Sequence, residues 1–406
     1  LLLDDPVQPG RSPLKALGSS KGAASIVLLA MASTNLWTAC SSSDPAAQSS
    51  PDGGVDAAAP SDAGTEGDAT DGTPSCNESF CRLALPDMSG VAINASWAIS
   101  ASDVWVGGSG GYAAHFDGKN WTRIATGTNA AIFGITAGAD GTVWGANGGY
   151  TLLKLNRPAN GVSENINAQT NAIFDGISVA GSEVFIAGAT TGYTSDPILT
   201  NIWRYGTNPD GGAPSVIPIS PPCPGRDEPG DRCVRLHGVW AESAKRQWFV
   251  GEGGKAYVTD TSPPPADGGD GPSSVAIRLI EMNSSSLRNL HAIWGFAADD
   301  IWAVGAQGVI RHWTGGNPKT DAWQIVPSPV THDLRSLWGS RPDDIWAVGD
   351  DGTVIHWDGT SWTQREVPYA ADRRPRFHTV TAVGDEVWIG GVNAFLRSNH
   401  TTEADR

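Results

Sequence analysis

Short apolar segments separated by polar turns recur along most of the chain, and residues 334–368 show the unit most clearly. Four apolar segments alternate there with Arg-Pro-Asp-Asp, Asp-Asp-Gly and Asp-Gly-Thr turns, and these segments are Leu334–Gly339, Ile345–Gly349, Thr353–Trp357 and Trp362–Val367. Asp-Gly between β-forming residues is the strongest short-range signal of a β-hairpin. The stretch therefore predicts one four-stranded antiparallel meander.

Two columns of residues allow the copies of this unit to be counted. The second-strand column, in most copies an aromatic residue three positions before a glycine, consists of Trp105, Trp144, Phe185, Trp248, Trp302, Trp346 and Trp388. The first-strand column lies seven to nine residues earlier and consists of Trp97, Ile135, Ile177, Trp240, Trp294, Trp338 and Thr381. Most separations are close to the roughly 40–50 residues of a four-stranded blade. The pattern predicts an all-β, seven-bladed β-propeller over residues 76–400 whose tryptophans form its core.

The last blade is one strand short in sequence. Its strands are predicted at Phe377–Val383, Glu386–Gly391 and Ala394–Ser398, and the remainder, with a disordered tail at 401–406, has no further apolar segment. The apolar segment Phe80–Leu85 precedes the first strand of blade 1. We therefore expect it to supply the missing outer strand and to join the two ends of the propeller.

Residues 1–39 have the organisation of an export signal. Three basic residues precede a short apolar segment, Ala23–Ala32, which is too short to cross a bilayer as a helix. The following segment, Leu36-Trp37-Thr38-Ala39-Cys40, resembles the bacterial lipobox and predicts a lipid-anchored Cys40 at the outer membrane or cell surface. The alternative is cleavage after Ala30-Met31-Ala32 by ordinary signal peptidase, which would release a soluble protein.

Residues 40–75 are predicted to form a disordered tether. Within 41–75 there are seven acidic residues, no basic residue and no aromatic residue, so the segment lacks the apolar surface needed to fold. The whole chain has 27 Lys and Arg against 43 Asp and Glu, a net charge of −16. This charge argues against nucleic acid as a partner. We expect a monomer that contacts membrane only through its lipid.

Four cysteines follow Cys40 in two close pairs, and an exported protein with an even number of them favours disulfides. The pairs are Cys76 with Cys81 and Cys223 with Cys233. Neither pair has the spacing of a zinc site, and no metal or cofactor is predicted. The second pair lies within a Pro- and Gly-rich insertion at residues 206–235, and a similar insertion covers 261–274. Both insertions are predicted to be surface loops.

Residues that recur at the same blade position are expected to be structural, because a catalytic residue should be unique in the ring. By this criterion the third-strand histidines His115, His312 and His356 are predicted to be hydrogen-bonded parts of the blade. The pairs Asp299-Asp300 and Asp343-Asp344 are predicted to form turns rather than paired catalytic carboxylates. No catalytic residue is assigned.

One polar column near the start of the first strands is the candidate ligand site. It consists of His237, His291, Arg335 and His378 in blades 4 to 7, with Ile132 and Phe174 taken as the equivalents in blades 2 and 3. First strands are innermost, so these side chains would meet at one mouth of the central channel. Three histidines would suit a metal, whereas Arg335 argues for an anion or another polar ligand. Packing between blades is the alternative role.

The segment Asp343–Trp362 resembles the BNR or Asp-box-like repeats of bacterial secreted propellers, and Phe133–Leu155 is similar to a tectonin repeat of propeller lectins. The resemblance covers roughly residues 80–400 and is a likeness of the blade, which does not by itself confer an activity. Together with the lipobox-like segment, it leads us to expect a surface-tethered, non-enzymatic protein that binds a glycan or protein partner at one propeller face. The alternative is a propeller enzyme, a glycosidase or lyase, that uses the channel-mouth histidines. The absence of a distinctive carboxylate–histidine arrangement favours binding.

Overall fold

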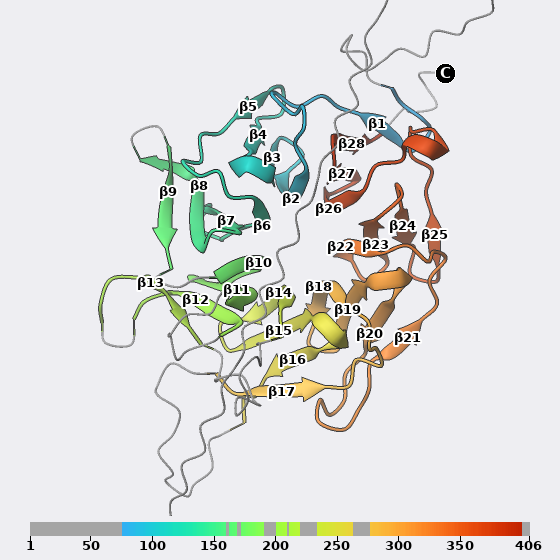
Figure 1. Cartoon of the computed structure of the whole chain (residues 1–406). Coiled ribbons are helices and arrows are strands. Elements are labelled where there is room, and N and C mark those ends of the chain that lie inside the picture. Colours follow the sequence, from blue (N-terminus) through green and yellow to red (C-terminus); the bar gives the residue numbers. More distant parts are fainter. Residues whose placement is uncertain are drawn as a thin grey trace, which may run out of the picture. The chain divides into compact units, whose positions relative to one another are not determined.

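The computed structural model describes residues 75–159, 162–168, 172–190, 200–208, 211–219, 234–262 and 277–399, which belong to one compact unit. Their strands form seven four-stranded antiparallel sheets (Figure 1). The predicted signal sequence, Cys40 and the tail at 401–406 lie outside the described residues, as does nearly all of the tether. No helix in the described ranges is long and apolar enough to cross a membrane.

Each of the first six blades runs in chain order from the innermost to the outermost strand. Blade 1 consists of β2 (Ile93–Ser100), β3 (Asp103–Gly108), β4 (Ala113–Phe116) and β5 (Trp121–Arg123). Blade 2 consists of β6 (Ile132–Ala137), β7 (Val143–Asn147), β8 (Thr151–Ala159) and β9 (Val162–Asn167). Blade 3 consists of β10 (Ala172–Ala180), β11 (Glu183–Thr190), β12 (Ile202–Gly206) and β13 (Ser215–Pro218). The insertion at 206–235 thus contains an outer strand and is not wholly a loop.

The second half continues the same order. Blade 4 consists of β14 (Leu236–Ser243), β15 (Arg246–Gly251), β16 (Ala256–Thr259) and β17 (Leu279–Met282). Blade 5 consists of β18 (Leu290–Ala297), β19 (Asp300–Gly305), β20 (Ile310–Trp313) and β21 (Gln324–Val326). Blade 6 consists of β22 (Leu334–Arg341), β23 (Asp344–Gly349), β24 (Val354–Trp357) and β25 (Trp362–Gln364). Short 3₁₀ turns lie at Ser109–Gly111, Glu252–Gly254, Ala306–Gly308 and Ala371–Arg373.

Blade 7 confirms the predicted closure. It consists of β26 (Phe377–Val383), β27 (Glu386–Gly391), β28 (Ala394–Ser398) and, as its outer strand, β1 (Phe80–Arg82). Phe80 pairs with Ser398 across the two strands, and its ring also meets Trp346 of blade 6 with centroids 6.1 Å apart. A disulfide joins Cys76 to Cys81, the middle residue of β1, whereas Cys223 and Cys233 lie outside the described residues.

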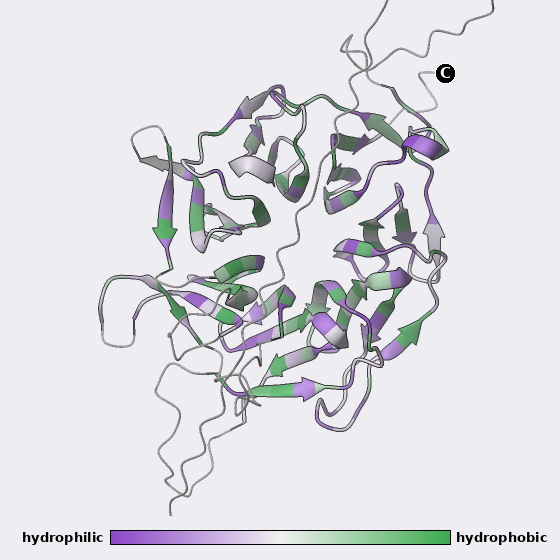
Figure 2. Cartoon of the chain, in the orientation of Figure 1, coloured by the Kyte–Doolittle hydropathy of each residue, from purple (hydrophilic) through white to green (hydrophobic). Residues whose placement is uncertain are grey.

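The seven first strands form a closed ring, because each contacts the first strands of both neighbouring blades, including β2 with β26. The seven-bladed propeller prediction is confirmed. Figure 2 shows apolar residues along the blade strands, where stacked sheets bury both faces. The second-strand aromatics are buried in six blades, and Trp346 is partly buried. Glycines make room for the tryptophans: a Cβ on Gly295 would lie 2.7 Å from the indole of Trp240 in the preceding blade.

The third-strand histidines have the structural role predicted for them. In blade 1, Asp103 Oδ1 accepts hydrogen bonds from Trp105 Nε1 at 2.7 Å and pairs with His115 Nε2 at 2.9 Å, and the two rings stack. Blades 5 and 6 repeat this arrangement around Asp300 and Asp344. Asp299 and Asp343 lie in the turn as predicted, but Asp300 and Asp344 begin the next strand, where each forms hydrogen bonds with a histidine and a tryptophan.

Candidate ligand-binding site at the channel mouth

A β-bulge near the start of every first strand creates the site. In blade 4, Leu236 pairs with Gly251 and Gly238 pairs with Val250, which leaves His237 without a partner across the two strands. The same shift of register occurs in the other six blades. A bulge turns one side chain away from the regular alternation of side chains between the two faces of the sheet. The bulged residues are Asn94, Phe133, Asp175, His237, His291, Arg335 and His378, and all seven line one recess of about 160 Å³ that is open to solvent.

The structure corrects the predicted equivalents in blades 2 and 3. Ile132 and Phe174 immediately precede the bulge and are fully buried, whereas Phe133 and Asp175 are the residues at the mouth. Sequence reasoning also missed Asn94 in blade 1. The bulge occurs at a three-residue pattern in the sequence, in which an apolar residue is followed by any residue and then by a small residue. The pattern reads Leu-His-Gly in blade 4, Phe-Asp-Gly in blade 3 and Ile-Phe-Gly in blade 2. The blades must therefore be aligned on the buried apolar residue that precedes the bulge, and not on the polar residue at the bulge.

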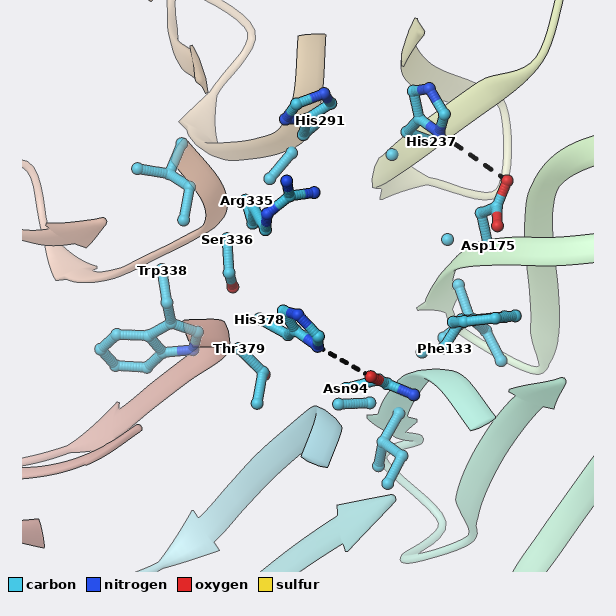
Figure 3. Close-up of a pocket in the computed structure, with 18 of the residues that line it drawn as sticks. Asn94, Phe133, Asp175, His237, His291, Arg335, Ser336, Trp338, His378 and Thr379 are labelled. Atoms are coloured by element: carbon cyan, nitrogen blue, oxygen red, sulfur yellow. Dashed lines mark hydrogen bonds and ion pairs between the residues drawn. The ribbon is translucent and has the colours of Figure 1, made fainter. Parts of the chain in front are cut away.

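The structure brings the four predicted residues together around this mouth. Figure 3 shows them with Asn94, Phe133 and Asp175, and with Arg335 and His378 opposite Asp175 and Phe133. The rings of His237 and His291 meet edge to face with centroids 5.7 Å apart. The groups come from seven different blades, so the rigid ring of first strands fixes their relative positions.

Arg335 is already paired within the protein. Its Nε donates to Asp350 Oδ1 at 2.5 Å and its Nη2 donates to Oδ2 at 2.8 Å, which is a bidentate ion pair. Asp333 lies 3.6 Å from Nη2, and Arg376 also contacts Asp350 at 3.1 Å. The Asp350 hydrogen bonds raise the pKa of Arg335. Burial acts to raise the pKa of Asp350, but the combined hydrogen bonds and charges of its arginines hold that pKa below its ordinary value.

Asp175 is paired in the same way on the opposite side. Arg235 donates through Nε to Oδ2 at 2.5 Å and through Nη2 to Oδ1 at 2.6 Å, and this pairing raises the pKa of Arg235. His237 Nδ1 lies 3.8 Å from the same carboxylate. Asp175 and Asp350 thus each have a bidentate guanidinium partner, so the charges of these two pairs compensate one another.

Two of the histidines are neutral rings with a defined proton position. His291 Nδ1 lies 2.9 Å from the carbonyl oxygen of Leu334, and because a carbonyl only accepts, Nδ1 carries the proton. Burial lowers the pKa of His291 despite this hydrogen bond. His378 Nδ1 donates to Asn94 Oδ1 at 2.9 Å. Burial, assisted by the nearby charges of Arg335 and Arg376, lowers the pKa of His378 to about 4.

Tryptophans form the floor of the recess. Trp97 of blade 1 and Trp294 of blade 5 have ring centroids 6.2 Å apart, although their blades are not neighbours, so the rings meet across the channel. Trp338 continues the cluster at 5.6 Å from Trp294. All three line the recess with the hydrogen-bonded hydroxyls of Ser96 and Thr379. In the part of the chain that the structure describes, no group of three or more His, Cys, Asp or Glu side chains is placed to hold a metal ion.

No protein-family model matches the chain, and no curated protein matches it in sequence. Solved β-propeller structures do match its fold. The structure of YCF48 bound to D1 peptide is 14% identical with a TM-score of 0.54, covering 80% of this chain and 96% of that one. YCF48 from Cyanidioschyzon merolae is 14% identical with a TM-score of 0.55, covering 79% and 98%. A catalytically inactive virginiamycin B lyase from Staphylococcus aureus with quinupristin is 12% identical with a TM-score of 0.57, covering 79% and 98%. These identities establish a shared fold only.

Proposed function

We propose that this chain is a non-enzymatic binding protein that holds a glycan or protein partner at the channel mouth. The observation that carries this proposal is the contrast between two repeated positions. The Asp–His–Trp arrangement recurs with the same side chains in blades 1, 5 and 6, as a structural element does. The bulge recurs in all seven blades, yet its side chains are Asn, Phe, Asp, His, His, Arg and His. A fixed backbone position with varied, inward-facing groups suits the recognition of one asymmetric ligand.

The ion pairs at the mouth support binding over catalysis. A carboxylate that acts as a general acid or base must be able to exchange a proton with the substrate. Both oxygens of Asp175 and both oxygens of Asp350 are engaged by a bidentate arginine, so neither carboxylate is placed to exchange a proton with a substrate. The rival function is a lyase-type enzyme that uses a neutral mouth histidine as its base, and the fold shared with virginiamycin B lyase gives this rival its support.

Exposed apolar side chains make the same face suitable for a larger partner. We define the mouth face as the side on which the first strands begin and the second strands end. Among the described residues, four of the six exposed large apolar side chains lie on it, namely Phe133, Tyr150, Leu287 and Val392. These side chains provide apolar contacts around the rim for a partner that covers more than the recess itself. The similar fold of YCF48, whose structure holds a peptide, supports a protein partner as one form of the proposal.

The proposed setting is the outside of a bacterial cell, with Cys40 lipid-anchored and the propeller carried on the acidic tether. The lipobox-like segment before Cys40 and the composition of residues 41–75 support this part of the proposal.

Site-specific photocrosslinking would test the proposed face. A benzophenone amino acid replaces Phe133 at the mouth or, as the matched control, Ile99 near the opposite end of a first strand; the two side chains are 37% and 42% exposed. Intact cells bearing the full-length protein should give a discrete adduct from position 133 and none from position 99. Adducts from position 99 alone would place the partner elsewhere. Turnover of glycosides or of quinupristin that is lost in His291→Ala would establish the enzyme instead.

A further inference from the structure

The geometry of the mouth points to an uncharged, hydroxyl-rich ligand, which we infer to be a neutral saccharide unit. This inference rests on the proposed function and narrows it to one chemical class. The sequence left an anion and another polar ligand open, and the contacts that Arg335 and the histidines already make within the protein favour the uncharged one.

The histidines present hydrogen-bond acceptors to a ligand. In a neutral imidazole one nitrogen donates and the other accepts. Nδ1 of His291 donates to the Leu334 carbonyl and Nδ1 of His378 donates to Asn94 Oδ1, so Nε2 of both rings carries a lone pair. Lone pairs repel a carboxylate or phosphate and accept from a hydroxyl. A sugar hydroxyl can also accept in return from the Asn94 amide, which lines the same recess.

Arg335 does not supply the charge that an anion needs. Both nitrogens of its Nε–Nη2 edge are engaged by Asp350, and Asp333 lies near the same side chain. Asp175 is compensated by Arg235 in the same manner. Moving an anion from water into this site would therefore lose hydration without gaining an uncompensated cation. A neutral polyol loses less on transfer and retains its hydrogen bonds.

The aromatic surfaces complete the match. Phe133 stands at the rim with 37% of its surface exposed, and Trp97 and Trp294 form the floor. A pyranose has an apolar face of C–H groups beside its hydroxyl edge. An aromatic rim and floor combined with polar side chains between them provide for both parts of such a ring.

The test uses pairs of saccharides that differ only in charge. Full-length protein is titrated by calorimetry with neutral sugars chosen from an array and with the matching uronates, in which a carboxylate replaces the C6 hydroxymethyl group. We expect each bound neutral sugar to bind at least tenfold more tightly than its uronate. His291→Ala, His378→Ala and Phe133→Ala should each weaken it at least tenfold with a native melting temperature, and the exposed, distant Arg341→Ala should not. Phe133 is partly exposed, so its variant keeps the test valid if a histidine variant fails to fold.

A second variant tests the reason for the selectivity. Asp350→Asn removes the carboxylate from Arg335 without altering the recess lining, to which Asp350 does not belong. We expect this variant to bind the uronate more tightly than wild type does and to reduce the preference for the neutral sugar.

Different failures have different meanings. Equal or tighter binding of uronates by wild type would overturn the neutral-ligand inference. A peptide that crosslinks at position 133 while no saccharide on the array binds would also overturn it and would leave the proposed function standing. If ligands of neither class bind and position 133 gives no adduct, both proposals are wrong.

Discussion

Phe80 offers a direct measure of how much the closure strand stabilises the propeller. Its ring is 1% exposed and packs between β28 of its own blade and Trp346 of blade 6. Truncating a buried Phe to Ala costs about 3–5 kcal/mol through lost transfer energy and the cavity left behind. For a domain of this size roughly 2 °C is lost per kcal/mol, so Phe80→Ala should lower the melting temperature by about 6–10 °C.

Differential scanning calorimetry of the wild-type and variant proteins would measure this shift. Ile325→Ala is the matched control, because Ile325 also lies in an outermost strand, β21, but is 68% exposed. A surface change of this kind should alter stability by less than about 0.5 kcal/mol. A truncated protein that begins at Gly90 loses β1 altogether and should melt lower than Phe80→Ala. Wild-type melting of both the Phe80 variant and the truncated protein would refute the closure argument.

Three further predictions test other parts of the molecule. Cys40→Ser should abolish palmitate incorporation and release the protein from the membrane fraction, whereas a mature N-terminus at Ser33 would show ordinary secretion instead. The pKa of His378 is about 4 in the folded protein against an ordinary 6.5, so between these values the unfolded chain binds a proton that the folded protein does not. The free energy of unfolding should therefore fall as the pH falls from 6.5 to 4, and it should fall less steeply in His378→Gln. Identical profiles of stability against pH for the variant and the wild type would contradict this. Gly295→Ala should destabilise the propeller by about 1–3 kcal/mol in urea unfolding, since its Cβ would lie 2.7 Å from the Trp240 ring, and an unchanged midpoint would contradict that packing.

The sequence carried enough information to predict the blades and the closure strand, because both depend on local apolar segments and on their regular spacing. It did not locate the whole mouth. A β-bulge adds one residue without breaking the apolar pattern, so Ile132 and Phe174 were taken for the inward residues that are in fact Phe133 and Asp175. The pairing of Arg335 with Asp350 and of Asp175 with Arg235 depends on how strands and loops meet in space. No spacing rule in the sequence indicates that these charges are compensated, nor that Trp97 would meet Trp294 across the channel.

The repeated bulge separates the residues that hold each first strand in place from the one residue that faces the mouth. The buried apolar residue before each bulge and the strand after it hold the backbone in place, while the bulged side chain makes no contribution to the alternating core. Seven such positions surround one axis, and the side chain at each of them can be exchanged independently of the others. Under the proposed function, ligand preference can therefore be re-engineered one blade at a time by exchanging single mouth residues such as Phe133 or His237, while the buried residues of the strands are left unchanged.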